Sequence, residues 1–397
     1  MNPALAPLDD AQAARRADAG LLSLALIDAR NHTLRWLAAF EAAGALGRDE
    51  GGAAPLVLAA RAGHYQERWI TRHLQRQRGE ASQPSALRLP PADAAIDAWI
   101  AEGVGPAPEA AALRAWLADT LETTLDLLGA AAEDDAGLHF FRQALVHEDR
   151  LGEALAERAV ELQLADTGEA PRGLLPARPA RAPLRFAAQR LQLGSAPGGW
   201  VADNERWAHE VALPEFEIDA QALSWARYME FAEDGGYDRR ELWSEPGWDW
   251  VQAEGRRAPR HVEQLRARVV AERRGRLQSV PLAQPVLHVA AHEAEAWCRW
   301  AGRRLPTEPE WELAALAGAA RGFAWGDVFE WVAGSARPWP GHASAPGSID
   351  PMPAPGSQGV LRGASWMSRA RQHHPKARRF ASRTSDQLFC GFRSCVL

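Results

Sequence analysis

Two histidines, His64 and His147, stand in segments whose residue types are typical of a metal site. A helix that binds a metal through two side chains usually presents them at positions i and i+4, one turn apart on the same face. His147 begins such a pair, but Leu151 occupies the i+4 position. Imidazole, carboxylate and thiol groups bind first-row transition metals, whereas a branched alkane has no lone pair to donate. The sequence therefore predicts part of a metal site with one donor missing.

Glu67 is the residue best placed to supply another donor. It follows His64 by three residues, so both side chains should lie on one face of a helix. Together with His147 it would give a set of two histidines and one carboxylate, which is a common iron(II) arrangement. The alternative is that Glu67 simply forms an ion pair with a neighbouring arginine, Arg68 or Arg72.

Composition limits the class of protein. The chain has 397 residues, 47% of them hydrophobic, which is enough for two ordinary cores. Its net charge of −6 excludes a nucleic-acid partner, because binding phosphates requires a basic face. The polar N-terminal residues and the lack of a long apolar run predict no membrane span and a cytoplasmic location. The three cysteines, Cys298, Cys390 and Cys395, show no CxxC spacing, so we expect them to be reduced and buried.

The elements that must position the two histidines are helices. The first part of the chain is rich in Ala, Leu, Arg and Glu, with apolar residues at helical spacing. Breaks at Gly and Pro predict helices over residues 18–46, 54–77, 109–130 and 135–164. Four long helices with short connections can close into one bundle.

The second part of the chain has a different character. A stretch dense in Pro, Gly and Ala separates it from the first, and we place the domains at 1–170 and 195–397 with a connecting segment at 171–194. Beyond that segment we expect few strands, short helices over 224–233 and 292–301, and much irregular structure. Thr307 followed by Glu310 forms a capping-box pattern that predicts another helix start. The fold class predicted for the whole chain is α+β.

Four motifs in the second part resemble the formylglycine-generating-enzyme (sulfatase-modifying factor) fold: RRLPTEPEWELAA at 303–315, WGDVFEW at 325–331, LRGASW at 361–366 and GFR at 391–393. The resemblance implies a C-type-lectin-like domain with little regular structure. Formylglycine-generating enzymes bind copper through a cysteine pair shortly before the final GFR, but residues 365–389 contain no cysteine. A copper-dependent formylglycine-generating oxidase is therefore a hypothesis that lacks its metal ligands.

A helical bundle of DinB type joined to this domain resembles the sulfoxide synthases of ergothioneine biosynthesis. GHYQERWI at 63–70, RAPRHVE at 257–263 and QLFCGFRSC at 387–395 are most similar to the selenoneine synthases within that family. The resemblance implies an iron(II) enzyme that uses O2 to join a thiol or a selenosugar donor to the imidazole C2 of hercynine. Three histidines would hold the iron and leave positions open for oxygen and the donor.

The resemblance assigns roles to individual residues around that iron. His64 and His147 match the first two ligands, and Leu151 stands where the third histidine is expected. Arg150 falls where the ergothioneine enzymes have a glutamine near the substrate, and it would place a cation beside the metal.

The same resemblance points to a substrate-binding loop near the C-terminus. Phe380 matches an aromatic residue that would pack against the trimethylammonium group of hercynine, and Arg379 and Trp366 would also contact substrate. Ser385 replaces an arginine that would hold an acidic co-substrate, which favours a neutral donor such as a selenosugar. An iron(II) enzyme is thus the leading hypothesis, and a metal-free, non-catalytic homologue that binds hercynine is its main alternative.

Overall fold

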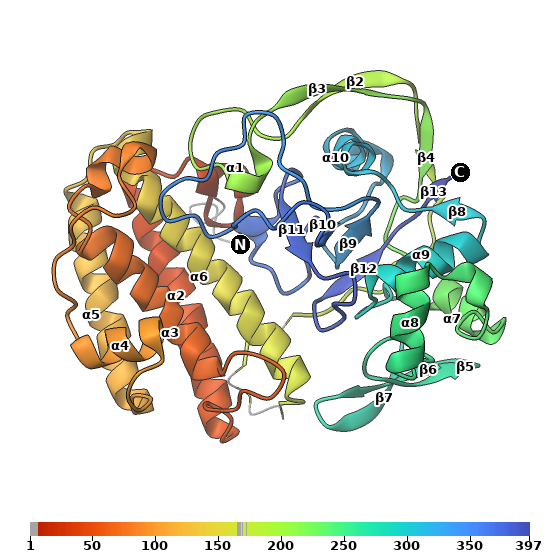
Figure 1. Ribbon diagram of the computed structural model, residues 1–397, viewed down its shortest axis with the longest axis horizontal. Coiled ribbons are helices and arrows are strands. Elements are labelled where there is room, and N and C mark those ends of the chain that lie inside the picture. Colours follow the sequence, from red (N-terminus) through yellow and green to blue (C-terminus); the bar gives the residue numbers. More distant parts are fainter. Residues whose placement is uncertain (1–6, 165–167, 169, 172) are drawn as a thin grey trace.

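The computed structural model describes residues 7–164, 168, 170, 171 and 173–397. In these residues a group of long helices is followed by a part built from short strands and short helices (Figure 1). Residues 1–6, and residues 165–167, 169 and 172 around the predicted connecting segment, lie outside the described part. No helix among the described residues combines the length and the apolar character needed to span a bilayer.

The long helices occupy nearly the positions that the sequence predicts. The helices of the first part are α1 (Ala11–Arg15), α2 (Ala19–Ala42), α3 (Pro55–Gln66), α4 (Ala94–Glu102), α5 (Ala110–Gly129) and α6 (Asp135–Glu161). Aspartates cap the starts of four of them; in α2, for example, Asp18 accepts a hydrogen bond from the Leu21 N–H, and in α6 Asp134 accepts one from the Gly137 N–H.

Two features of this part differ from the prediction. The helix expected over 54–77 ends early, since α3 passes into a π-helical turn (Glu67–Thr71) and then, after a break, a 3-10 turn (Arg76–Ala81). Helix α4 is an addition, because its nine residues stand between Pro91 and Gly103 in a stretch that the sequence suggests to be a loop. Its start is capped by Asp93, and Gly103 ends it in the left-handed conformation.

The second part holds more strands than the sequence predicts. Thirteen strands of two to six residues appear in the described residues, each too short to leave a clear alternating pattern. One sheet has the order β1 (Leu184–Phe186), β4 (Phe216–Ile218), β13 (Cys395–Val396), β8 (Arg303–Arg304), and another has the order β11 (Arg378–Ala381), β10 (Gly359–Arg362), β9 (Phe329–Val332), β12 (Cys390–Phe392). The remaining strands are β2 (Gln189–Leu193) paired with β3 (His209–Leu213), and β5 (Val262–Arg266), β6 (Arg268–Arg273) and β7 (Arg276–Val280) in one small sheet.

Short helices cover these sheets (Figure 1). They are α7 (Trp225–Glu233), α8 (Glu245–Ala253), α9 (Ala291–Trp300) and α10 (Glu308–Ala317), with 3-10 turns at Asp203–Glu205, Arg240–Leu242, Ala319–Arg321 and Ala370–Gln372. Helices α7 and α9 confirm the predictions for 224–233 and 292–301, and Thr307 with Glu310 forms the expected capping box of α10. Helix α8 was not predicted.

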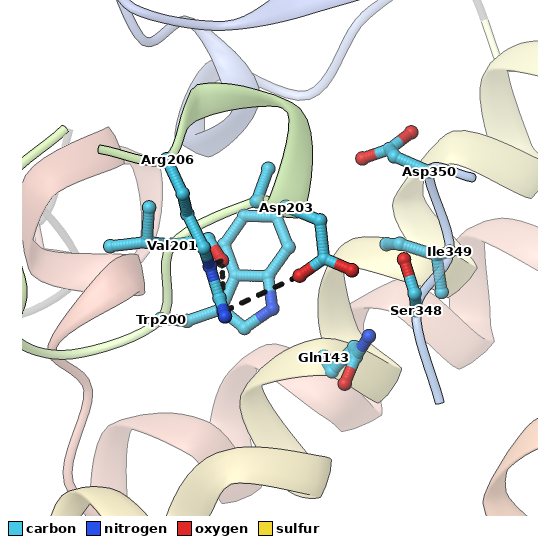
Figure 2. Close-up of a pocket in the computed structure, with 9 residues that line it drawn as sticks. Gln143, Trp200, Val201, Asp203, Arg206, Ser348, Ile349 and Asp350 are labelled. Atoms are coloured by element: carbon cyan, nitrogen blue, oxygen red, sulfur yellow. Dashed lines mark hydrogen bonds and ion pairs between the residues drawn. The ribbon is translucent and has the colours of Figure 1, made fainter. Parts of the chain in front are cut away.

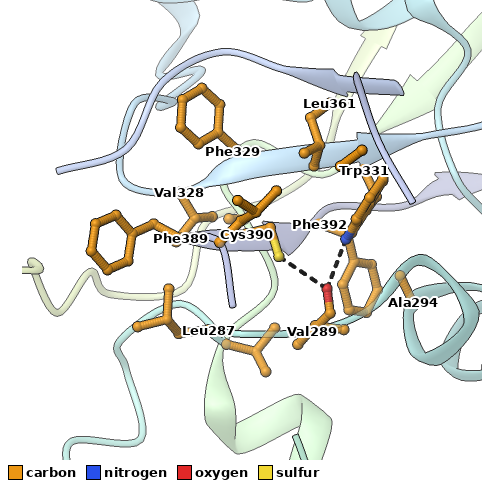
Figure 3. Packing of buried hydrophobic residues seen from close by; sticks show 14 of the residues in the cluster. Leu287, Val289, Ala294, Val328, Phe329, Trp331, Leu361, Phe389, Cys390 and Phe392 are labelled. Carbon is orange, nitrogen blue, oxygen red and sulfur yellow. Dashed lines mark hydrogen bonds between the residues drawn. The ribbon is translucent and has the colours of Figure 1, made fainter. Parts of the chain in front are cut away.

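The core of the second part lies against strands β9 and β12 (Figure 3). Trp331 is fully buried there, and its indole Nε1 donates a hydrogen bond to the Val289 carbonyl at 2.7 Å. The Cys390 thiol donates to the same carbonyl at 3.2 Å. All three cysteines are free and buried, as the sequence predicts.

One face of α6 joins the two parts of the molecule through three carboxylates spaced four residues apart: Asp149, Glu153 and Glu157. Asp149 accepts both arms of the Arg371 guanidinium at 2.8 Å. Glu153 accepts a hydrogen bond from the Ser368 hydroxyl at 2.7 Å, and Glu157 pairs with Arg379 at 3.1 Å. We call these three residues the α6 carboxylate row.

Replacing Asp149 should measurably destabilise the protein. Asp149→Asn removes the buried carboxylate of Arg371 and leaves only the partly exposed Asp28 as its anion, so we expect the free energy of unfolding to fall by about 3 kcal/mol. Urea unfolding followed by tryptophan fluorescence measures this change. The control is Glu210→Gln, which removes an ion pair with Arg190 on the exposed β2–β3 hairpin and should cost less than about 0.5 kcal/mol. Equal effects of the two substitutions would contradict a joining role for the α6 carboxylate row.

Candidate functional site

Helices α3 and α6 bring His64 and His147 close together. The His147 ring packs against the Tyr65 ring, with 4.6 Å between centroids. Burial, followed by the charges of Arg150, Arg61 and His64, lowers the pKa of His147 to about 3. Burial also lowers the pKa of His64, opposed by the neighbouring Asp97. Both imidazoles are therefore neutral near pH 7, the state in which a ring nitrogen can donate to a metal.

The position of the expected third ligand is part of the hydrophobic core. Leu151 is 8% exposed and belongs to the same apolar cluster as Leu155, Ala62 and Trp36. This packing explains why a leucine fits there, and it places no donor atom at the i+4 position from His147.

Glu67, the predicted substitute, binds the backbone instead. One of its carboxylate oxygens accepts a hydrogen bond from the Ala92 N–H at 2.6 Å, and the other has no hydrogen-bond partner. Burial raises the pKa of Glu67. The side chain thus ties the π-helical turn after α3 to the segment that leads into α4.

Asp97 is the carboxylate that approaches His64, and it is not among the site residues that the sequence predicts. Its Oδ1 atom lies 3.4 Å from His64 Nε2 and 2.9 Å from the Arg72 guanidinium. Asp97 stands on α4, so the Asp93 cap of that helix was the signal that could have revealed it. The contact itself spans more than thirty residues of sequence and could not be read from spacing.

The donor atoms around His64 and His147 fit a metal ion only in part. His147 Nδ1 is buried and has no hydrogen-bond partner, which suits a nitrogen donor, whereas His64 Nε2 faces the Asp97 carboxylate at 3.4 Å. However, among the residues that the structure describes, no group of three His, Cys, Asp or Glu side chains is arranged to hold a metal. The residues present therefore fit two ligands of the predicted set and do not fit a three-histidine iron centre. We call His64 and His147 the histidine pair.

A segment of the second part lies over the first turns of α6, beside the histidine pair. Tyr65 and Gln143 both donate hydrogen bonds to the Gly347 carbonyl, at 2.9 and 2.7 Å. Gly347 has φ of +75°, and a Cβ there would lie 2.8 Å from the Tyr65 hydroxyl, so a side chain would not fit. We call residues 345–350 the covering segment.

The covering segment also binds Arg150, the residue that the sequence places beside the metal. Arg150 forms an ion pair with Asp350, and both side chains are partly buried. Figure 2 shows Asp350, Ile349 and Ser348 of this segment facing Gln143 of α6 and Asp203. The crevice that they line has a free volume of about 0 Å³, so it cannot admit a small molecule in this conformation.

The predicted substrate residues of the C-terminal loop are engaged with protein groups. Arg379 pairs with Glu157, and its guanidinium lies 4.9 Å from the Phe329 ring centre. Phe380 stands opposite Val360 in the sheet, with the Arg378 guanidinium 4.9 Å from its ring centre. The structure thus brings Arg379 to α6, whereas Phe380 packs against the core of the second part.

Trp366 is the predicted substrate residue that reaches an open space. Its ring packs on Phe389, with 4.4 Å between centroids, and it lines a cavity of about 550 Å³. Neither residue of the histidine pair lines this cavity.

Comparison with known proteins identifies similar chains. Residues 187–327 match the model of the "Sulfatase-modifying factor enzyme 1-like domain" family. The chain is 32% identical to the hercynine oxygenase of Mycolicibacterium smegmatis over 345 residues, which cover 70% of this chain and 76% of the relative. It is 30% identical to the hercynine oxygenase of Mycolicibacterium thermoresistibile over 432 residues, which cover 94% of each chain. A formylglycine-generating enzyme of Streptomyces coelicolor is 34% identical, but over 38% of this chain and 52% of the relative.

Restoring a histidine at position 151 should strengthen metal binding. In Leu151→His the new imidazole lies one turn from His147 on α6, so it can add a third donor. We expect iron(II) affinity to rise at least about tenfold, the lower end of what outer hydrogen-bonding partners contribute to metal sites. Anaerobic calorimetric titration with iron(II) measures this change.

The matched control is Leu151→Gln, which introduces a polar group of similar size without an imidazole. It should leave iron(II) affinity unchanged, and thermal unfolding of both variants shows how far each disturbs the core. If the two variants bind iron(II) equally, position 151 does not face the histidine pair.

Proposed function

Because this chain belongs to the hercynine oxygenase family, we propose that it acts on hercynine and joins a chalcogen atom to C2 of its imidazole ring. In the proposed reaction the C2–H of hercynine, a thiol or selenol and O2 give a sulfoxide or selenoxide and water. The two hydrogens leave in the water, one oxygen stays on the chalcogen, and O2 takes up the four electrons. The observation that carries the proposal is a match that spans 94% of both chains and so extends over both parts of the molecule.

We propose that the chalcogen donor is a neutral molecule such as a selenosugar. Ser385 stands where an arginine for an acidic donor is expected, and the neighbouring Arg383 is already paired with Glu295. The side chains of Ser382 and Thr384 bind each other at 2.9 Å. This turn therefore offers hydroxyl groups, which suit a sugar, and no free cation for a carboxylate.

The catalytic form of this proposal requires a metal that can react with O2, and iron(II) is the metal we propose. Two donors of the expected set, His64 and His147, are available to it. Since the position of the third donor is held by Leu151, a second candidate is a metal-free homologue that binds hercynine without turning it over. The packed, apolar surroundings of Leu151 are the observation that favours this second candidate.

Iron content and product formation together distinguish the two candidates. The full chain is loaded anaerobically with iron(II), and iron is counted per chain. It is then given hercynine, O2 and either cysteine or a selenosugar, and products are identified by mass spectrometry. The oxygenase predicts about one iron per chain and the selenoxide as the main product, and His64 and His147 would be the residues that hold the metal.

The measured iron content, hercynine binding and product distinguish the candidates. Tight hercynine binding with neither iron nor product would establish the binding homologue and overturn the oxygenase. If hercynine binds neither with iron(II) nor without it, both candidates are overturned. Product formed only from cysteine would overturn the neutral donor.

Phe380 provides a test of how hercynine is held. If its ring packs against the trimethylammonium group, Phe380→Leu should weaken hercynine binding by about 3- to 30-fold, in line with the loss of one cation–π contact. Phe380→Tyr keeps the ring and should bind hercynine as the natural chain does. Calorimetric titration without metal measures both values. Equal losses in the two variants would show that Phe380 acts on binding through the core rather than through the ring face.

A further inference from the structure

A cavity near the contact between the two parts of the molecule lies away from the histidine pair. It measures about 550 Å³ and is bounded by α2, by the 366–370 segment after β10, and by described residues of the connecting segment. Small-molecule sites commonly have volumes of roughly 300–1,000 Å³ and often form where domains meet. The cavity has the size and the location of a ligand site.

This cavity and His147 lie on different faces of α6. His32 of α2 lines it, and this histidine packs against Gly152, where a Cβ would lie 2.8 Å from its Cδ2 atom. Gly152 follows His147 by five residues, which turns it about 140° around the helix axis. The cavity is therefore separate from the site that would hold a metal.

The charged groups along its wall favour an anion. Arg35 and Arg369 both line the cavity, and Asp9 is the one acidic residue among the described residues that do so. Arg369 binds Asp28 through Nη2, which leaves its Nη1 without a hydrogen-bond partner among the described residues. Arg35 is exposed and forms no ion pair with any described residue. Two guanidinium groups thus have donors to spare, and such groups bind carboxylates and phosphates with good geometry.

Three other side chains of the wall, His32, Trp366 and Met367, carry no charge. Burial, followed by the charge of Arg369, lowers the pKa of His32 to about 4, so this ring carries no charge near pH 7. Trp366 and Met367 supply an indole face and a thioether. The contact of the Trp366 ring with Phe389 and the hydrogen bond from the Trp366 backbone N–H to the Asp327 carbonyl fix the position of this residue. A flat ring in the ligand would find a prepared surface there.

We propose that this cavity is a second binding site, which takes a small organic anion with a carboxylate or phosphate group attached to a flat ring. Its wall is connected to the α6 carboxylate row, because Ser368 binds Glu153, and Arg369 and Arg371 share Asp28. A ligand held by Arg35 and Arg369 bridges α2 and the second part of the molecule. Binding therefore stabilises the contact between the two parts.

Benzoate, phenyl phosphate and the neutral benzyl alcohol are probes that test this site on the full chain. Calorimetry and thermal unfolding should show saturable binding of at least one anion with a Kd below about 1 mM, and none of benzyl alcohol. The tighter anion identifies the acidic group of the natural ligand. Arg35→Gln and Arg369→Gln should each weaken binding about tenfold, as expected for the loss of a charge-assisted hydrogen bond.

Arg266→Gln on β5 is the matched control, since it removes an exposed arginine that does not line the cavity, and it should bind the anion normally. Arg35→Gln keeps the test valid if Arg369→Gln does not fold, because Arg35 is exposed and unpaired. The proposal is overturned if no anion binds, if benzyl alcohol binds as well, or if Arg35→Gln binds normally. Competition between the anion and hercynine would also overturn it, because the two sites would then be one. The result does not depend on whether the histidine pair binds iron.

Discussion

The α6 carboxylate row is the interaction on which the arrangement of this molecule depends. Burying a carboxylate is costly unless a partner compensates for the lost water, and each of the three has a partner on the second part of the chain. Arg371, Ser368 and Arg379 come from different turns and strands, so all of these must be in place together. The row thus fixes both the position and the rotation of α6 against the second part.

A fixed rotation of α6 determines where its other side chains point. Leu151 lies about 40° around the helix from His147, toward α3, where Ala62 and Leu155 complete an apolar contact. Leucine at this position satisfies the packing of the helices as well as any residue could. The helices of the bundle therefore pack well with a leucine at position 151, although this leucine gives the histidine pair no third donor.

Much of the fold could be predicted from the sequence, because long helices repeat their apolar residues over many turns. Helices α2, α5 and α6 gave that signal, whereas α4 is short and flanked by proline and glycine, and the strands of the second part are shorter than one period of pattern. The motif residues 303–315 indicated the fold of the second part through resemblance, and the matched family agrees with it.

The candidate site was predicted less completely, for a physical reason. Spacing along one helix reveals pairs such as His147 and Leu151, and it shows that Leu151 brings no donor atom to that face. The approach of Asp97 to His64, and the pairing of Arg150 with Asp350, join residues that are far apart in sequence. Such contacts arise when separate elements pack together, so no local pattern records them.

The carboxylates that pair with the arginines influence which ligands each region can accept. Arg150 and Arg379, the two cations expected near the substrate, are neutralised by Asp350 and Glu157. An anionic co-substrate entering there would have to displace a carboxylate that already makes the same contact, which leaves little net gain. A neutral donor faces no such competition. Under the proposed function, these ion pairs within the protein therefore disfavour an acidic donor.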